Sequence, residues 1–235
     1  MASINDIKDA VLFNKQAYDQ MNENEKKVFD YFNDNNEQPK GGCFRKNKDP
    51  EFTDDRYDDL VMEKLNTYAN KAKALQRIGM DESQVNEIEP IRLYGFERKS
   101  AAVGDVYFDK VCDDGRWRSS VCSITWLFFS NDQICMYSGR FDMLSDSKIE
   151  LTDEYFYKDI TNFTTVTETE QTIIYSGGKT GCLKKSAEPA KKLTDYDTFM
   201  LIVPGDKFRC SVSGVANAKQ VIDGVKQKLR EKKVF

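Results

Sequence analysis

The chain has 235 residues, which suits one sizeable domain or one domain with an extension. It contains 35 Lys and Arg against 39 Asp and Glu, so its net charge is −4, whereas general nucleic-acid binders are normally basic. Histidine is absent, which excludes Ser-His-Asp and Cys-His catalysis and every His-ligated metal site. We therefore expect no catalytic site, no metal and no cofactor.

Nothing in the sequence resembles a targeting segment. The start, Met1 to Asp6, lacks the basic and apolar regions of a secretory signal, and the apolar cluster 126–129 is far too short to span a bilayer. These features predict a cytoplasmic protein, although a mature product whose signal has been removed stays open. Without a C-x-x-C pair or a signal, the cysteines in strand-like runs are expected to be buried free thiols: Cys112, Cys122, Cys135 and Cys210.

The first third of the chain has helical periodicity. Residues 4–33 carry apolar positions at helical spacing, and the polar stretch 22–25 divides them into two helices. An Asn- and Asp-rich loop follows. Asp49-Pro50 is a helix start signal, and the next helix is predicted to run to Ile78 and to end at Gly79.

From Ile91 onward the apolar period changes to that of strands. Segments 91–96 and 106–109 alternate, and 113–115 form a turn. Residues 116–129 and 134–141 read as a hairpin.

The last part contains more strands and one helix. Strands are expected at 154–160, 163–169 and 172–175, and a Lys-rich connection, 177–192, separates them from strands 199–203 and 208–212. The final helix, capped by Asn217, has one apolar stripe, formed by Ala218, Val221, Ile222, Val225 and Leu229.

Two segments carry a resemblance to a known family. Trp126-Leu127-Phe128-Phe129-Ser130-Asn131-Asp132-Gln133-Ile134 and Glu154-Tyr155-Phe156-Tyr157-Lys158-Asp159-Ile160-Thr161, followed by a closing hairpin and helix, resemble bacterial pleckstrin-homology-like (PH-like) proteins. The resemblance implies an α+β chain: a helical extension, 1–88, then a PH-like antiparallel β-barrel or bent sheet, 89–235, plugged by the C-terminal helix. It also implies a binding or scaffolding role.

Basic residues are the candidates for binding an anionic ligand. Arg116 and Arg118 follow Lys110, but Asp113 and Asp114 lie between them, which departs from the lipid-binding pattern of the family. The other candidates cluster between strands, where each would add about 1 kcal/mol near an anionic surface: Lys179, Lys184, Lys185, Lys191 and Lys192.

A cysteine and a group of aspartates are further candidate sites. Cys43 lies among Lys and Arg residues, which lower a thiol pKa, so it is the candidate reactive thiol, with an ordinary exposed thiol as the alternative. Asp54 and Asp58, with the neighbouring Asp55 and Asp59, would either hold a hard cation or form a solvated helix face.

The preferred prediction is a non-catalytic module that binds a protein or peptide, at a groove beside the final helix or at an exposed strand edge. The alternative is peripheral attachment to anionic membrane lipids through the 179–192 loop and the C-terminal helix. A third reading, an enzyme that uses Cys43 or carboxylates, has the least support. A nucleic-acid partner is not expected.

Overall fold

A computed structural model describes residues 18–33, 52–85, 89–98, 107–112, 114–176, 188–215 and 218–233, with the main chain alone at 170–176, 188–196, 218 and 233. The described elements run in chain order as α2 (Glu23–Asn33), α3 (Asp54–Tyr68), α4 (Lys71–Ile78), η1 (Glu82–Val85), β1 (Ile91–Phe96), β2 (Asp109–Val111), β3 (Trp117–Ser119), β4 (Val121–Phe129), β5 (Gln133–Asp142), β6 (Lys148–Phe156), η3 (Tyr157–Asp159), β7 (Asn162–Ser176), β8 (Glu188–Val203), β9 (Asp206–Ser211) and α5 (Ala218–Lys233).

The predicted α+β class is confirmed, but the described sheets are not closed into a barrel. They are antiparallel, with strand orders β1-β4-β5-β6, β2-β3 and β7-β8-β9. Closure of the first sheet would require β1 to pair with β6. Instead, the outer side of β1 bonds to the segment after β9, where the Gly214 amide donates to the Tyr94 carbonyl at 3.1 Å.

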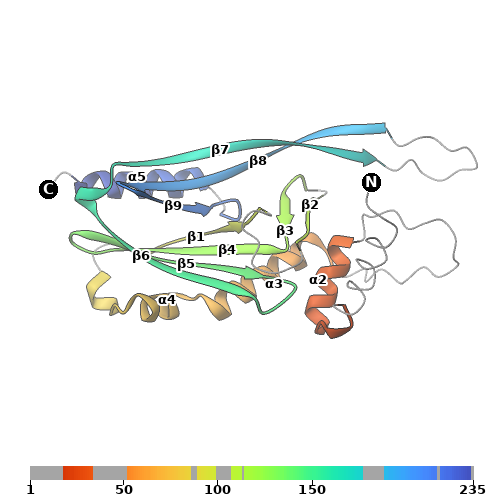
Figure 1. Cartoon of the computed structure of the whole chain (residues 1–235), viewed down its shortest axis with the longest axis horizontal. Coiled ribbons are helices and arrows are strands. Elements are labelled where there is room, and N and C mark those ends of the chain that lie inside the picture. Colours follow the sequence, from red (N-terminus) through yellow and green to blue (C-terminus); the bar gives the residue numbers. More distant parts are fainter. Residues whose placement is uncertain are drawn as a thin grey trace, which may run out of the picture.

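The two central strands of the four-stranded sheet, β4 and β5, are buried on both faces. Helices α3 and α4 lie on one face, and β7, β8, β9 and α5 lie on the other (Figure 1). Alternate side chains of β4 therefore enter two different cores. Ile124 and Phe128 pack with the helices, whereas Leu127 and Phe129 pack with α5.

The helices depart from prediction at two points. The predicted single helix 50–78 begins later, at a cap formed by Thr53, whose side chain accepts from the Arg56 amide. It is also divided into α3 and α4 at Ala69, whose carbonyl accepts a 2.8 Å hydrogen bond from the Trp126 indole. Gly79 ends α4 in the left-handed conformation, as predicted.

The predicted hairpin is confirmed, with one division. β4 and β5 pair in register, for example Leu127 with Met136. The expected run 116–129 breaks at Ser120, whose amide donates to the Phe108 carbonyl. β3 consequently pairs with β2, and β4 pairs with β1 and β5.

The later strands are longer than predicted. β6 begins at Lys148 rather than at residue 154, and η3 separates it from β7. β7 is one strand, and β8 begins at Glu188, so residues 188–192 belong to a strand and not to a connection. The far halves of β7 and β8 form a two-stranded ribbon, because β9 pairs only with Thr198–Val203 (Figure 1).

The final helix and the cysteines agree with prediction. Ile222, Val225 and Leu229 of α5 are buried in one core. The four described cysteines are free and buried: Cys112, Cys122, Cys135 and Cys210. Within the described part of the chain, no helix has the length and apolar character needed to cross a bilayer.

Candidate functional site: an open strand edge and an aspartate–arginine cluster

The side chains of the candidate lysines are not among those that the structure describes. Lys179, Lys184 and Lys185 lie outside the described residues, as does Cys43. Lys191 and Lys192 are successive residues of β8, paired with Ile173 and Thr172.

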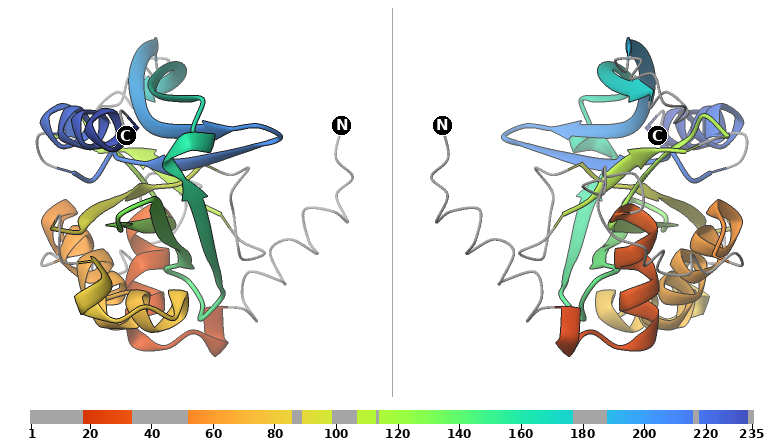
Figure 2. Two further views of the ribbon diagram at one scale, coloured as in Figure 1. Left: turned by 90° about the vertical axis from the view of Figure 1, so that its left-hand side faces the viewer. Right: turned by 90° about the vertical axis from the view of Figure 1, so that its right-hand side faces the viewer.

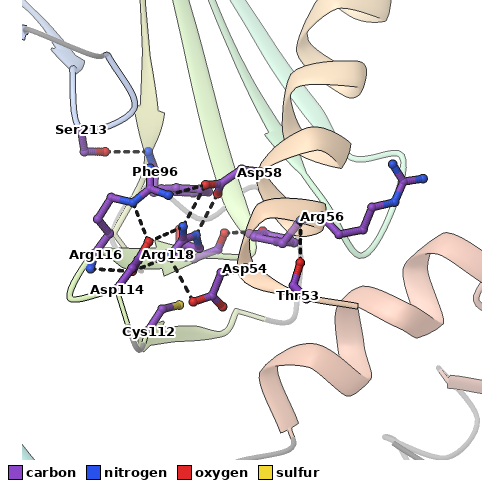
Figure 3. Close-up of polar contacts among 12 residues, drawn as sticks. Thr53, Asp54, Arg56, Asp58, Phe96, Cys112, Asp114, Arg116, Arg118 and Ser213 are labelled. Carbon is purple, nitrogen blue, oxygen red and sulfur yellow. Dashed lines mark hydrogen bonds and ion pairs between the residues drawn. The ribbon is translucent and has the colours of Figure 1, made fainter. Parts of the chain in front are cut away.

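Arg116 and Arg118 do come together, but with carboxylates. Asp54 and Asp58, one turn apart on α3, meet Arg118 on β3, together with Asp114 and Arg116 from the turn before it (Figure 3). We call these five residues the aspartate–arginine cluster.

Arg118 is the centre of the cluster and is fully buried. Its Nε and Nη2 donate to the two oxygens of Asp58, each at 2.8 Å. Its Nη1 and Nη2 donate to the two oxygens of Asp114, at 3.0 and 2.8 Å. Both carboxylates are thus held bidentately, the strongest geometry available to a guanidinium. Arg116, 58% exposed, contacts the same two aspartates from outside.

These contacts shift the pKa of both partners. Hydrogen bonds from Arg118, and then from Arg116, hold the pKa of Asp114 well below its usual range. Burial alone would lower the pKa of Arg118, but the hydrogen bonds to Asp58 and Asp114 outweigh it and raise that pKa. An anionic ligand at Arg118 would have to displace the carboxylates of Asp58 and Asp114. Because Asp58 is on α3 and Arg118 is on β3, the cluster instead holds these two elements together. The pairing was missed in the sequence because Asp58 lies 60 residues from Arg118.

A tyrosine and a cysteine extend the cluster to α2. The Tyr31 hydroxyl donates to Asp54 at 2.7 Å and lies 3.2 Å from the Cys112 sulfur. Burial raises the pKa of Cys112. The thiol is therefore held protonated, which opposes a nucleophilic role.

The outer edge of β6 is a different kind of surface. β6 ends the order of its sheet and lies at its margin (Figure 2), and no described strand pairs with its outer side. Within the described part of the chain, all the exposed large apolar side chains are on this strand: Ile149 at 41%, Leu151 at 47% and Phe156 at 45%. Sequence reasoning missed this surface because it began the strand at residue 154.

The hydrogen bonds at the two ends of β6 show which main-chain groups face outward. The Asp142 amide donates to the Ser147 carbonyl, and the Tyr157 amide donates to the Asp132 carbonyl, both at 3.0 Å. Both pairs continue the β5–β6 register, and hydrogen-bonded pairs recur at every second residue. The odd-numbered residues of β6 therefore bond to β5. The even-numbered residues direct their N–H and C=O groups to the open edge: Lys148, Glu150, Thr152, Glu154 and Phe156.

Charge changes sign along this edge. At the start of β6, a cavity of about 430 Å³ is lined by the cations Lys73, Arg77 and Lys148, with Glu150, Tyr68 and Gln76. Glu150 is already paired with Arg77 at 2.9 Å and Lys148 at 3.1 Å. Toward its end, β6 carries Asp153 and Glu154. One end of the open edge is thus basic and the other acidic.

A second cleft, of about 580 Å³, lies between α2, α3 and the turn after β5. Its carboxylates are Glu23, Glu25, Glu63 and Asp146. Lys64 also lines it, but its amine already donates to the carbonyls of Asp142 and Ser145. The described residues include no group of three or more acids or cysteines placed to hold a metal ion. This cleft therefore offers no defined ligand geometry.

Comparison with known proteins yields no relative. No family model, no curated protein and no solved structure matches this chain.

Proposed function

We propose that this chain is a non-catalytic interaction module that binds a protein by adding a partner strand to the outer edge of β6. The observation that carries the proposal is the coincidence of two features on one strand. The exposed apolar side chains Ile149, Leu151 and Phe156 lie on the same strand as the unpaired main-chain edge. Strand addition uses both features, because main-chain bonds supply affinity and side chains supply specificity.

The length of β6 supports this mode. The nine residues Lys148–Phe156 offer outward N–H and C=O groups at every second position, which match an extended partner segment. An open strand edge that carries exposed apolar side chains is otherwise prone to aggregation. A specific partner that covers it removes this hazard.

The PH-like resemblance and the membrane alternative remain predictions. The membrane reading needs a shared basic surface, and the side chains of its candidate lysines lie outside the described part of the chain. Co-sedimentation with anionic and with neutral liposomes tests it directly. Binding to anionic liposomes alone, lost on charge reversal of the lysines, would favour attachment to lipid over a protein partner.

A photo-crosslinking experiment tests the protein-binding proposal. Benzoylphenylalanine is placed at Leu151 and, as a control, at the exposed Lys219 of α5, in the full chain within its own cells. We expect adducts that contain protein at position 151 and not at 219. The same experiment is repeated with Thr152→Pro, which removes one outward N–H group and leaves the bonds to β5 intact.

Three outcomes decide the proposal. Protein adducts at position 151 that disappear with Thr152→Pro support strand addition. Adducts that persist with Thr152→Pro show binding that does not use the strand edge, and they would overturn the proposal. Absence of protein adducts at position 151 overturns it as well. Circular dichroism of the Thr152→Pro chain establishes that it is folded.

A further inference from the structure

We infer that the partner on the β6 edge is β6 of a second copy of this chain, paired antiparallel about a two-fold axis that passes at Leu151. The inference rests on the proposed function and names the occupant of that same site. It makes one continuous sheet from the β1-β4-β5-β6 sheets of the two copies. The positions of the outward main-chain groups and of the charges along β6 select this arrangement.

The hydrogen-bonding pattern of β6 limits the registers in which two copies of the strand can pair. The outward main-chain groups of β6 belong to its even-numbered residues, as the bonds at Ser147 and Tyr157 show. In an antiparallel pair, residues that bond across the interface lie directly opposite each other. An even residue must therefore face an even residue of the partner, so the two-fold axis passes at a residue and never between two residues.

Charge then selects one register. An axis at any residue from 150 to 154 overlaps at least five residues of each strand. The axis at 150 places Glu150 opposite its own copy, and the axes at 153 and 154 do the same for Asp153 and Glu154. The axis at 152 places Glu150 opposite Glu154. Like charges directly opposite each other destabilise a strand pair. Only the axis at 151 avoids them all.

The selected register is also complementary. Lys148 of each copy lies opposite Glu154 of the other, so the basic start of one β6 meets the acidic end of its partner. The cations Lys73 and Arg77 that flank Lys148 reinforce the attraction. Glu150 lies opposite the uncharged Thr152, and Asp153 lies opposite Ile149, so no further charge pair is formed.

The centre of the interface is apolar. Leu151 is 47% exposed in the single chain. In the dimer it lies directly opposite Leu151 of the second chain, and these two residues exchange no main-chain hydrogen bonds. Such pairs bring Cα atoms to about 4.5 Å, closer than hydrogen-bonded pairs. Ile149 of both copies lies on the same face, diagonal to this contact.

Sedimentation velocity of the full chain over a range of concentrations tests the dimer and its register. Lys148→Glu and Glu154→Lys each replace two symmetric attractions by repulsions. Each is expected to weaken the dimer by about tenfold or more. The double variant Lys148→Glu/Glu154→Lys restores both pairs and should restore the dimer. Asp223→Lys on α5 is the matched control, because it changes the net charge as Glu154→Lys does, away from β6.

Disulfide trapping locates the axis independently. Leu151→Cys places two thiols opposite each other at the axis, within reach of a disulfide. Ile149→Cys is matched in face and exposure, but its copies are four residues apart along the strands, about 14 Å. On mild oxidation, Leu151→Cys should form a covalent dimer at least tenfold faster than Ile149→Cys. The wild-type chain, oxidised in parallel, accounts for the natural cysteines.

Each outcome bears on the inference. A wild-type chain that stays monomeric at every concentration overturns it, and so does a dimer unaffected by both single charge reversals. Equal trapping of the two cysteine variants overturns the register. In the first case, crosslinks from position 151 to another protein that Thr152→Pro abolishes would still uphold strand addition, so the inference and the proposed function fail separately.

Discussion

The two edges of the four-stranded sheet differ in how their main-chain groups are treated. At the β1 edge, the Phe96 amide donates to Ser213 at 3.0 Å, and the Tyr94 carbonyl accepts from Gly214 at 3.1 Å. The chain passes so close that a Cβ on Gly95 would lie 2.6 Å from the Ser213 hydroxyl. The β6 edge has no such cover among the described residues.

The difference teaches that this fold can close a sheet edge with its own backbone, and that among the described residues it does so at β1 and not at β6. The aspartate–arginine cluster lies on that closed side, where Arg118 lines a small cavity with Tyr94 and Gly95. Natural proteins commonly blunt an exposed edge with charges or cover it. β6 instead combines apolar side chains with charges of both signs, which favours selective pairing over simple protection.

The largest expected effect on stability comes from removing the central arginine of the aspartate–arginine cluster, on the closed side of the sheet. Arg118→Met leaves Asp58 and Asp114 without their buried partner and should lower the free energy of unfolding by about 3 kcal/mol. Urea denaturation at pH 7 measures this. Arg116→Met is the control. Because Arg116 is 58% exposed, its loss should cost about 0.5 kcal/mol. Equal losses for the two variants would contradict the central place of Arg118.

The next largest effect on stability is expected where the segment after β9 passes close to β1. Gly95→Ala inserts a methyl group against Ser213, and the forced displacement should lower the free energy of unfolding by about 2 kcal/mol. Gly224→Ala in α5 is the matched control. No atom lies within 4 Å of its added methyl, and a helical Gly→Ala change stabilises by about 0.5–1 kcal/mol. A neutral Gly95→Ala would show that the 211–215 segment does not hold β1.

The pH dependence of stability tests the contribution of Asp114 to the aspartate–arginine cluster. The pKa of Asp114 is lowered in the folded chain, so its stabilisation is complete above its unfolded pKa of about 3.9 and is lost as the pH falls through the folded value. The difference in unfolding free energy between wild type and Asp114→Asn should therefore be constant from pH 7 to about pH 5 and shrink below about pH 4.

Other carboxyls do not disturb that comparison. Burial raises the pKa of Asp142 and Glu97, which acts in the opposite direction, but both groups are present in the two chains and cancel in the difference. A difference that stays constant down to the lowest measurable pH would exclude the ion pair as the source of the stabilisation.

The smallest effect on stability is expected at the open edge. Leu151→Lys changes a half-exposed side chain and should alter the free energy of unfolding of the monomer by less than about 0.5 kcal/mol. The same change places two charges at the proposed axis and should abolish association. Unfolding measured at low concentration, beside sedimentation at high concentration, separates these effects. A large loss of stability would mean that β6 is needed by the monomer itself.

Local patterns in the sequence predicted most of the elements, and tertiary contacts explain the departures. Gly79, the β4–β5 hairpin and the buried stripe of α5 followed from residue type and periodicity. The break at Ala69 was not predicted, although Asn70 is a local start signal: its side chain caps α4 by accepting from the Lys73 amide, and Trp126, 57 residues away, bonds to the Ala69 carbonyl. The Lys-rich composition around Lys191 predicted a connection, where pairing with β7 makes a strand.

The candidate site was harder to predict for a related reason. Arg116 and Arg118 stood out as positive charges, but their meaning depends on Asp58, brought beside them by packing of α3. The β6 edge is open because no described strand pairs with its outer side. Which strands lie beside β6 depends on the whole fold and is not visible in a local sequence pattern. Alternation such as Ile149 and Leu151 is read as one buried face, whereas here both side chains are exposed.

The buried cysteines give this chain a chemical reporter of its own opening. Burial raises the pKa of Cys135 to about 11 and that of Cys122 to about 12. At pH 7 Cys122 is therefore held as the unreactive thiol, and solvent cannot reach it because it is fully buried. Alkylation of Cys122 must therefore wait for β4 to separate from its neighbours, so the labelling rate at that position counts how often the sheet opens.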